Sequence, residues 1–230
     1  MVDAPRRQLQ MSTSRPRRAP LSKEAVFQAA LDLADAEGIE ALTMRRLAEA
    51  LGVEAMSLYH HARNKDVILD AMIDRVFAEI ELPRPEEGWR DGLARRARSA
   101  RAALRRHPWA TRLMESRSNP GPANLTHHDA MLGCLRRGGF SVPLAAHAYA
   151  VLDAYVYGFV HTEQMLPFQS GDELHAFADT MLAAIPAGVY PHLVELTRDH
   201  VLQPGYAFAH EFEWGLTLLL DGLEARRAGS

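Results

Sequence analysis

The chain has 230 residues, of which 47% are hydrophobic and 24% charged, a composition typical of a globular protein. It has no apolar run near the ~20 residues that a membrane-spanning helix needs, and its arginine-rich start lacks the apolar segment of a secretory signal. The single cysteine, Cys134, excludes an intrachain disulfide framework. We therefore expect a protein of the reducing cytoplasm, without a membrane partner.

Charge is unevenly distributed along the chain. Residues 1–142 hold 23 Lys and Arg against 18 Asp and Glu, whereas residues 143–230 hold three Arg against 11 acidic residues. A basic front part and an acidic rear part favour contact between the front part and a polyanion. The alternative is a chance distribution of surface charge without a partner.

Residues 1–20 contain five Arg, three Pro and few large apolar groups, so we expect a disordered basic arm there. Apolar residues at helical spacing then predict a first helix, with Ser22 as its N-cap and Gly38 at its end. Thr43 is expected to cap a second helix, which Gly52 ends.

The third predicted helix is short, at about Glu54–His61, and Asn64 is expected to cap a fourth. The stretch "ELPRPEEG" has two prolines, which break helices, and places a domain boundary near residues 82–88. Because β-branched residues are sparse and no hairpin signal occurs, we predict an all-α fold with a small N-terminal bundle (21–82) and a larger C-terminal one (83–230). In the second bundle, helical patterns lie at about 87–106, 109–116, 122–137, 143–167, 172–184, 189–202 and 207–226.

Residues 43–61 have the pattern of a helix-turn-helix. Ala48 is small where the first helix must approach the second, and Gly52, four residues later, permits the sharp turn. Leu58 then anchors the second helix in the shared core. In this arrangement the outward face, which a recognition helix presents to the major groove, consists of Ala55, Met56, Ser57, Tyr59, His60 and His61.

The stretch "LTMRRLAEALGVEAMSLYHHARNKDVILDAM", residues 42–72, resembles the DNA-binding domain of TetR-type transcriptional regulators, particularly the tetracycline repressor branch. The similarity is weaker after residue 82, although "LRRGGFS" and the long apolar helix after it still resemble that branch. The resemblance implies an N-terminal three-helix DNA-binding domain with a helix-turn-helix, followed by a larger helical regulatory and dimerisation domain. It implies a ligand-responsive regulator, most simply a repressor that binds a palindromic operator in double-stranded DNA as a homodimer.

The resemblance also implies roles for individual residues in DNA binding. Arg45 matches a residue that reaches a guanine, for which the guanidinium fork is suited, and Thr43 and Met44 lie beside it near the DNA backbone. The base-reading positions at the start of the recognition helix hold Ala55, Met56 and Ser57, and the phosphate-holding positions hold Tyr59, His60, His61 and Lys65. Ala55 and Met56 replace a glutamine and a proline of tetracycline repressors, so we expect a different operator sequence.

Three alternatives to these roles remain open at this point. Tyr59 is a core aromatic residue in one, and Arg45 is a solvated surface charge in another. The third makes metal ligands of His60, His61 and Asn64, although no partner with useful spacing accompanies them.

The regulatory half is expected to form the dimer and to bind a small-molecule effector. Two apolar stripes are candidates for the dimer face: Leu144, Ala148, Val151, Leu152, Tyr155, Phe159 and Thr162 on one helix, and Trp214, Leu216, Leu219, Leu220 and Leu223 on another. Their alternative is the core of a monomer. The ligand-binding candidates combine apolar bulk with a few polar tips, and each is alternatively a core residue: Trp109, Met114, Tyr149, Tyr157, His161, Met165 and Phe168.

Tetracycline repressors hold a magnesium–drug complex with a histidine and an acidic residue, and in this chain those positions fall at Glu115 and Thr162. Neither residue matches the family's ligand, so we expect neither this metal complex nor a cofactor. The rival hypothesis is a helical-bundle enzyme, or a cofactor- or metal-binding protein, that uses His127, His128, Asp129 and His161. Cys134 lies within a helical pattern, which favours a buried structural thiol over a nucleophile.

Overall fold

The computed structural model describes residues 21–116 and 120–229, and these form helices and connecting loops without a β-strand. The basic arm expected at residues 1–20 lies outside the described residues. None of the described helices is long and apolar enough to span a membrane. Eleven α-helices are present in this part of the chain: α1 (Lys23–Glu37), α2 (Met44–Leu51), α3 (Ala55–Leu58), α4 (Lys65–Ala78), α5 (Trp89–Arg106), α6 (Ala110–Ser116), α7 (Pro122–Arg137), α8 (Val142–Gln164), α9 (Gly171–Ala184), α10 (Pro191–Leu196) and α11 (Phe208–Ala228).

The expected capping residues begin three of the N-terminal helices. The Ser22 and Thr43 hydroxyls accept hydrogen bonds from the backbone N–H groups three residues later, both at 3.1 Å. Asn64 Oδ1 does the same for the first turn of α4, at 3.0 Å. These side chains satisfy N–H groups that have no partner inside the helix, and the N-terminal ends of α1, α2 and α4 are therefore where the sequence predicts them.

The predicted extent of the third helix, about Glu54–His61, is wrong. Helix α3 covers only Ala55–Leu58, and the chain then leaves it through a turn in which the backbone N–H of His61 donates to the Leu58 carbonyl at 2.9 Å. Leu58 is the only buried residue of α3, and none of the three residues directly after it is buried, so little core contact holds a second helical turn.

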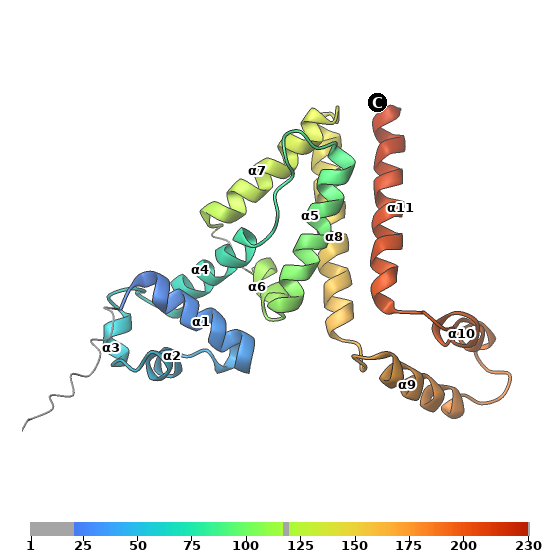
Figure 1. The fold of residues 1–230 in the computed structure, drawn as a ribbon, viewed down its shortest axis with the longest axis horizontal. Helices are drawn as coiled ribbons and strands as arrows, with labels where there is room; N and C mark the ends of the chain where they lie inside the picture. The colour runs from blue at the N-terminus through green and yellow to red at the C-terminus, as the bar shows by residue number, and fades with distance from the viewer. Residues whose placement is uncertain (1–20, 117–119, 230) are drawn as a thin grey trace, which may run out of the picture.

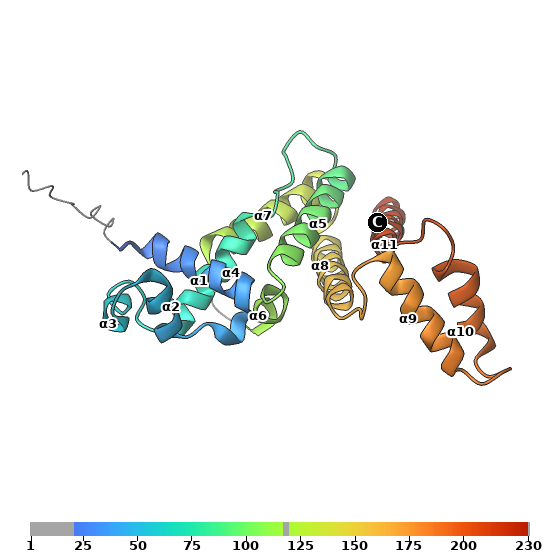
Figure 2. The ribbon, with the colours of Figure 1, turned by 60° about the horizontal axis from the view of Figure 1, so that its bottom comes forward.

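The helix predicted at 189–202 is also shorter than expected. Helix α10 starts only at Pro191, after Tyr190 at a left-handed φ of 57°, and it is followed by a π-helical turn, η2 (Thr197–Val201). Proline lacks an N–H and has a fixed φ, which suits the first position of a helix. In both views, α9 and α10 project away from the rest of the molecule, beyond the ends of α8 and α11 (Figures 1 and 2).

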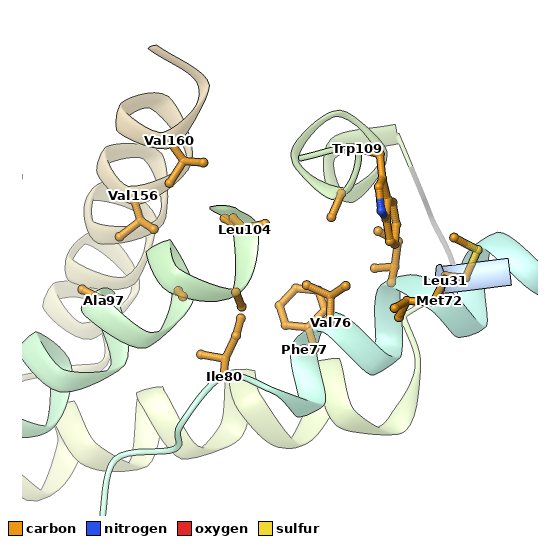
Figure 3. Close-up of a cluster of buried hydrophobic side chains, with 14 of the residues drawn as sticks. Leu31, Met72, Val76, Phe77, Ile80, Ala97, Leu104, Trp109, Val156 and Val160 are labelled. Carbon is orange, nitrogen blue, oxygen red and sulfur yellow. The ribbon is translucent and has the colours of Figure 1, made fainter. Parts of the chain in front are cut away.

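Helix α4 connects the two halves because it is apolar on more than one side. Met72 is fully buried towards the N-terminal helices, where Leu31 of α1 lies nearby, whereas Phe77 and Ile80 point towards α5 (Figure 3). One continuous hydrophobic cluster includes these residues together with Leu104 of α5. The loop after residue 82 therefore interrupts the helices but does not separate the cores.

A polar latch joins the same two halves. His107, after the last residue of α5, lies with Nδ1 2.8 Å from Asp35 Oδ1 of α1 and with Nε2 3.0 Å from Glu79 Oε1 at the end of α4. Trp109 Nε1 donates to Asp35 Oδ1 at 2.6 Å, and Arg106 donates to Glu79 Oε2 at 2.6 Å. We call Asp35, Glu79, Arg106, His107 and Trp109 the interdomain latch.

Salt bridges fasten α5 to the C-terminal helices. Arg98 binds both carboxylate oxygens of Glu213 on α11, at 2.7–3.0 Å, and Arg90 reaches Asp221 on α11 at 2.6 Å. Arg101 pairs with Glu163 of α8 at 2.6 Å, and its guanidinium carbon lies 4.7 Å from the ring centre of Phe212. Helix α5 is therefore tied to both α8 and α11, which run beside it (Figure 1).

The first prediction concerns the shared core. Met72→Ala removes a fully buried side chain, and the cavity and lost burial should lower the free energy of unfolding by about 2–5 kcal/mol. Met56→Ala is the matched control, because Met56 is 73% exposed and its loss should change stability by less than about 0.5 kcal/mol. Urea denaturation at one fixed protein concentration measures both, and equal effects would contradict the placement of the core.

The second prediction concerns the latch and pH. Desolvation raises the pKa of Glu79, but hydrogen bonds from Arg106 and His107 outweigh it and leave the pKa below its usual value. A carboxyl with a lowered folded pKa stabilises the fold above its unfolded pKa, and this contribution disappears as the pH falls through the folded pKa. Glu79→Gln should therefore lower the melting temperature at pH 7 and cause a progressively smaller loss below about pH 4.3, the unfolded value.

Glu86→Gln, in the exposed loop, should leave the melting temperature unchanged at every pH and serves as the control. A Glu79→Gln effect that stayed constant down to pH 3 would show that the charge of Glu79 does not hold the latch.

Candidate DNA-reading surface and effector site

The turn between α2 and α3 has the geometry that the sequence predicts. Gly52 adopts the left-handed conformation, with φ 62° and ψ 42°, and its N–H donates to the Glu49 carbonyl at 3.0 Å. The next N–H, of Val53, donates to the carbonyl of Ala48, which is 3% exposed. Leu58 is fully buried, and it therefore holds α3 against α2 with the opposite face of α3 outward.

The predicted DNA-binding residues of α2 lie at its N-terminal end. The hydroxyl of Thr43 is engaged as the N-cap, and Met44 is half-buried against the core. Arg45 has an 88% exposed side chain, and its Nε lies 3.3 Å from Glu49 Oε1 one turn along the helix. An exposed guanidinium in a solvent-accessible ion pair is free to exchange that carboxylate for another partner at little cost.

The candidates on α3 and in the turn after it differ in exposure. Met56 is 73% exposed and Tyr59 46% exposed, which removes the alternative of Tyr59 as a core aromatic residue. His60 is also exposed. The expectation that all six residues point outward is wrong for Ala55, which packs against the core, while Ser57 on α3 and His61 in the turn after it are half-buried.

Lys65, the last DNA-binding candidate, is half-buried and is the first residue of α4, directly after the Asn64 cap. The N-terminus of this 14-residue helix adds a partial positive charge beside the lysine. Both views show α2 and α3 at the opposite end of the molecule from α9, α10 and α11 (Figures 1 and 2).

A buried polar cluster occupies the interior of the regulatory half. Arg96 of α5, 1% exposed, donates from Nε to His127 Nε2 of α7 at 2.9 Å. Its Nη1 lies 2.6 Å from Asp153 Oδ1 of α8, which is also buried. His127 is fully buried, and desolvation, then Arg96 and then His128, lower its pKa to about 3, so the imidazole is neutral.

Tyrosines border this cluster on α8. The Tyr157 hydroxyl donates to Asp153 Oδ2 at 3.5 Å, and the Tyr149 hydroxyl lies 2.7 Å from Nε2 of His128. Burial, followed by the charge of Asp153, raises the pKa of Tyr157 to about 12 and raises that of Tyr149 as well. Both hydroxyls therefore keep their protons at neutral pH.

The seven predicted ligand-binding residues do not gather in one place. Tyr149 and Tyr157 border the polar cluster, whereas Trp109 is a core residue that forms part of the interdomain latch and Met114 is half-buried. His161 and Met165 are exposed at the end of α8. Phe168 lines a separate open cavity of about 450 Å³ between the ends of α5 and α8 and the starts of α9 and α11.

Arg96 and Asp153 are absent from the residues that the sequence predicts, and His127 and His128 are named there only as metal ligands or catalytic groups. The signal was available: Arg96 follows the inward spacing of Leu93, Ala100 and Ala103 on α5. Within the described part of the chain, no three His, Cys, Asp or Glu side chains are arranged to hold a metal ion. Cys134 is buried, and burial raises the pKa of its thiol, as a structural role requires.

Thr162, at one of the two positions that bind the magnesium–drug complex in tetracycline repressors, is exposed, and its hydroxyl donates to the Gly158 carbonyl at 3.0 Å. The side chain at the other position, Glu115, lies outside the described part of the structure.

Comparison with known proteins agrees with both halves of this arrangement. Residues 22–72 match the family described as bacterial regulatory proteins, tetR family, and residues 82–227 match the tetracyclin repressor-like C-terminal domain. The chain is 35% identical to the HTH-type transcriptional repressor DrrR1 of Streptomyces coeruleorubidus over 94% of this chain and 84% of that protein. It is 32% identical to the class A tetracycline repressor from transposon 1721 of Escherichia coli, over 90% of this chain and 92% of that one.

Solved structures give the same relationship. Apo ActR from Streptomyces coelicolor superposes with a TM-score of 0.76 at 32% identity, covering 92% of this chain and 98% of that one. ActR in complex with actinorhodin gives a TM-score of 0.75 at 32% identity, with 91% and 99% coverage. The helix-turn-helix at residues 43–61 and the helical domain that follows it thus belong to a member of the tetR family of bacterial regulatory proteins.

Proposed function

We propose that this protein is a cytoplasmic, ligand-responsive transcriptional repressor that binds a palindromic DNA operator as a homodimer and releases it when a small molecule binds the regulatory half. The observation that carries this proposal is the separation of two features: an exposed helix-turn-helix face with Arg45 and Met56, and a buried polar cluster around Arg96. Relatives that are transcriptional repressors, and an ActR structure with a bound small molecule, support it.

At the operator, α3 would enter the major groove, where base edges differ for every base pair. The 88% exposed guanidinium of Arg45 would leave Glu49 and bind a guanine through O6 and N7. Met56, with its thioether exposed, would make apolar contact with a thymine methyl group, while Tyr59 and Lys65 would contact phosphates. Thr43, Met44, Ala55, Ser57, His60 and His61 complete the proposed DNA-binding set.

Helices α8 and α11 would form the dimer interface. The expected dimer stripes divide in the structure: Leu152, Leu216 and Leu220 are buried in the protomer's own bundle, whereas Val151 and Trp214 are exposed. Trp214 is 68% exposed and Leu218, one turn later, 57% exposed. A tryptophan and a leucine adjacent on one helix face are typical of a protein–protein interface.

Ligand binding would act on DNA through α4. Phe77 of α4 lies 5.6 Å from the ring of His127, so the polar cluster contacts the helix that carries Lys65 at its other end. The interdomain latch holds the end of the same helix through Glu79. A ligand that moved α4 would therefore change the distance between the two DNA-binding domains of the dimer. It can shift the protein to this arrangement only if it binds the rearranged dimer more tightly.

The rival hypothesis of an enzyme or metal-binding protein has less support. The relatives found are transcriptional regulators. His127, one of the groups on which the rival depends, accepts a hydrogen bond from Arg96 and is fully buried. His161 is exposed on α8, apart from the buried His127.

The third prediction tests the reading surface. Arg45→Ala should cost about 1–3 kcal/mol of operator affinity and relax base preference at one position in each half-site. Operators are first selected from random duplex DNA, and affinities are then measured on the selected and on scrambled duplexes. Arg84→Ala, which removes an exposed arginine from the loop beyond α4, is the control and should change neither affinity. Equal weakening on both duplexes would show that Arg45 reads no base.

The fourth prediction tests the dimer. Trp214→Glu combined with Leu218→Glu places two charges on the proposed interface, where burying unpaired carboxylates is costly, so the protein should become monomeric. Light scattering after size-exclusion chromatography measures the mass. Leu125→Glu is the control, because Leu125 is 56% exposed on α7, away from α11. A dimer that survived the double substitution would place the interface elsewhere.

A further inference from the structure

Several buried polar atoms of the regulatory half lack a hydrogen-bond partner within the described chain, and two of them belong to the paired side chains Arg96 and His127. Apart from the ion pair of Arg96 with Asp153, these atoms are Arg96 Nη2, His127 Nδ1, Thr111 Oγ1 and Asn124 Oδ1. They belong to α5, α6 and α7, the helices of the regulatory half that adjoin α4 and α8 (Figure 1). Buried polar groups in native proteins are nearly always paired, so each unpaired one is a position where a ligand or an ordered water can supply the missing hydrogen bond.

The hydrogen bonds of His127 determine which of its nitrogens carries the proton. Arg96 Nε has only a hydrogen to give, so His127 Nε2, 2.9 Å away, must accept. The ring is neutral, and its single proton therefore lies on Nδ1. Nδ1–H is thus a fully buried donor without an acceptor. Arg96 Nη2 is a second such donor in the same cluster.

The charges of the cluster limit what kind of acceptor fits. Asp153, 2.6 Å from Arg96 Nη1, already neutralises the guanidinium. Burial, opposed in part by Asp153, lowers the pKa of His128, so that ring is neutral at pH 7 as well. A carboxylate would therefore add an uncompensated charge to a buried site, which is costly, whereas a carbonyl oxygen would satisfy the donors without one.

Aromatic rings lie beside His127 and its neighbour His128. The ring of Phe77 lies 5.6 Å from that of His127 and 6.5 Å from that of His128, and Tyr149 lies 4.9 Å from His128. Such rings favour a flat, apolar ligand, which gains from offset stacking and edge-to-face contact.

We infer that the effector is an uncharged, planar aromatic compound that presents a ketone or quinone carbonyl oxygen to His127 Nδ1–H, beside Phe77 of α4, with Arg96 Nη2 as a second donor. This inference rests on the proposed function, in that the regulatory half binds a small molecule. It names the chemistry by which the molecule is recognised, and it makes His127 a specificity-determining residue.

The test uses three ligands of similar shape and the full-length protein. 2-Acetylnaphthalene carries a neutral carbonyl, 2-isopropylnaphthalene replaces that oxygen with a methyl group, and 2-naphthoate carries a charged carboxylate. Calorimetric titration should show that the ketone binds the unsubstituted protein about tenfold more tightly than the hydrocarbon, as one satisfied buried donor implies. The ketone should also bind more tightly than the carboxylate.

Two substitutions at His127 separate recognition from structural support. His127→Gln places an amide oxygen near the position of Nε2, where it can still accept from Arg96, but removes the Nδ1–H donor. His127→Asn keeps an amide donor near Nδ1 and removes the acceptor for Arg96. The glutamine variant should lose the preference for the ketone over the hydrocarbon while keeping its melting temperature. The asparagine variant should keep the preference and melt at a lower temperature.

Several outcomes would overturn the inference. They are equal binding of ketone and hydrocarbon, tighter binding of the carboxylate, no binding of the ketone, or an unchanged preference in His127→Gln. Operator binding without ligand is measured in parallel, and all variants should retain it within a few-fold. A protein that prefers the ketone but binds no operator would contradict the proposed function and leave the inference standing. A protein that binds its operator but does not prefer the ketone would contradict the inference and leave the proposed function standing.

Discussion

The structure depends on the burial of α4 between two sets of helices. Met72 and Val76 are fully buried and Phe77 is 5% exposed, so the helix has apolar partners both in the DNA-binding half and in the regulatory half. If α4 had only one apolar stripe, it could pack against only one of the two halves, and a loop alone would link them. The DNA-binding half could then move independently, because domains linked by a loop alone have few shared contacts. With α4 buried on both sides, displacement of the DNA-binding half requires repacking of the core. That requirement makes α4 suitable for transmitting a change from the ligand site to DNA.

The interdomain latch fixes the relative orientation of the two halves, which the apolar contact alone does not specify. Hydrophobic burial is nonspecific in geometry, whereas His107 meets Asp35 and Glu79 through different ring nitrogens and so places α1 and the end of α4 in one arrangement. The energy of such partly exposed pairs is modest. Their contribution is to define the relative position of the two halves that core packing alone would leave less exact.

The polar cluster around Arg96 is costly for a protein interior. Removing a guanidinium and a carboxylate from water carries a large desolvation penalty, and an apolar replacement of a buried ion pair is often equally stable. Since apolar side chains could fill the same space, a role in binding explains the presence of Arg96, His127 and Asp153 better than a role in folding. The same cluster touches Phe77, and thus places the proposed recognition of a ligand directly beside the helix on which the fold depends.

The sequence by itself determined the local features of this protein. Caps at Ser22, Thr43 and Asn64, the left-handed Gly52 and the helical periodicity follow from interactions within a few residues, and the resemblance of residues 42–72 identified the DNA-binding half. Only the tertiary structure decided which apolar faces are buried. Leu216 and Leu218 of α11 are the same residue type two positions apart, but Leu216 is buried in the bundle and Leu218 is exposed. It likewise shortened α3, since the residues directly after Leu58 are not buried in the core. The Arg96 cluster joins residues from three helices, 26–57 positions apart, and pairing at such separations leaves no local pattern to read.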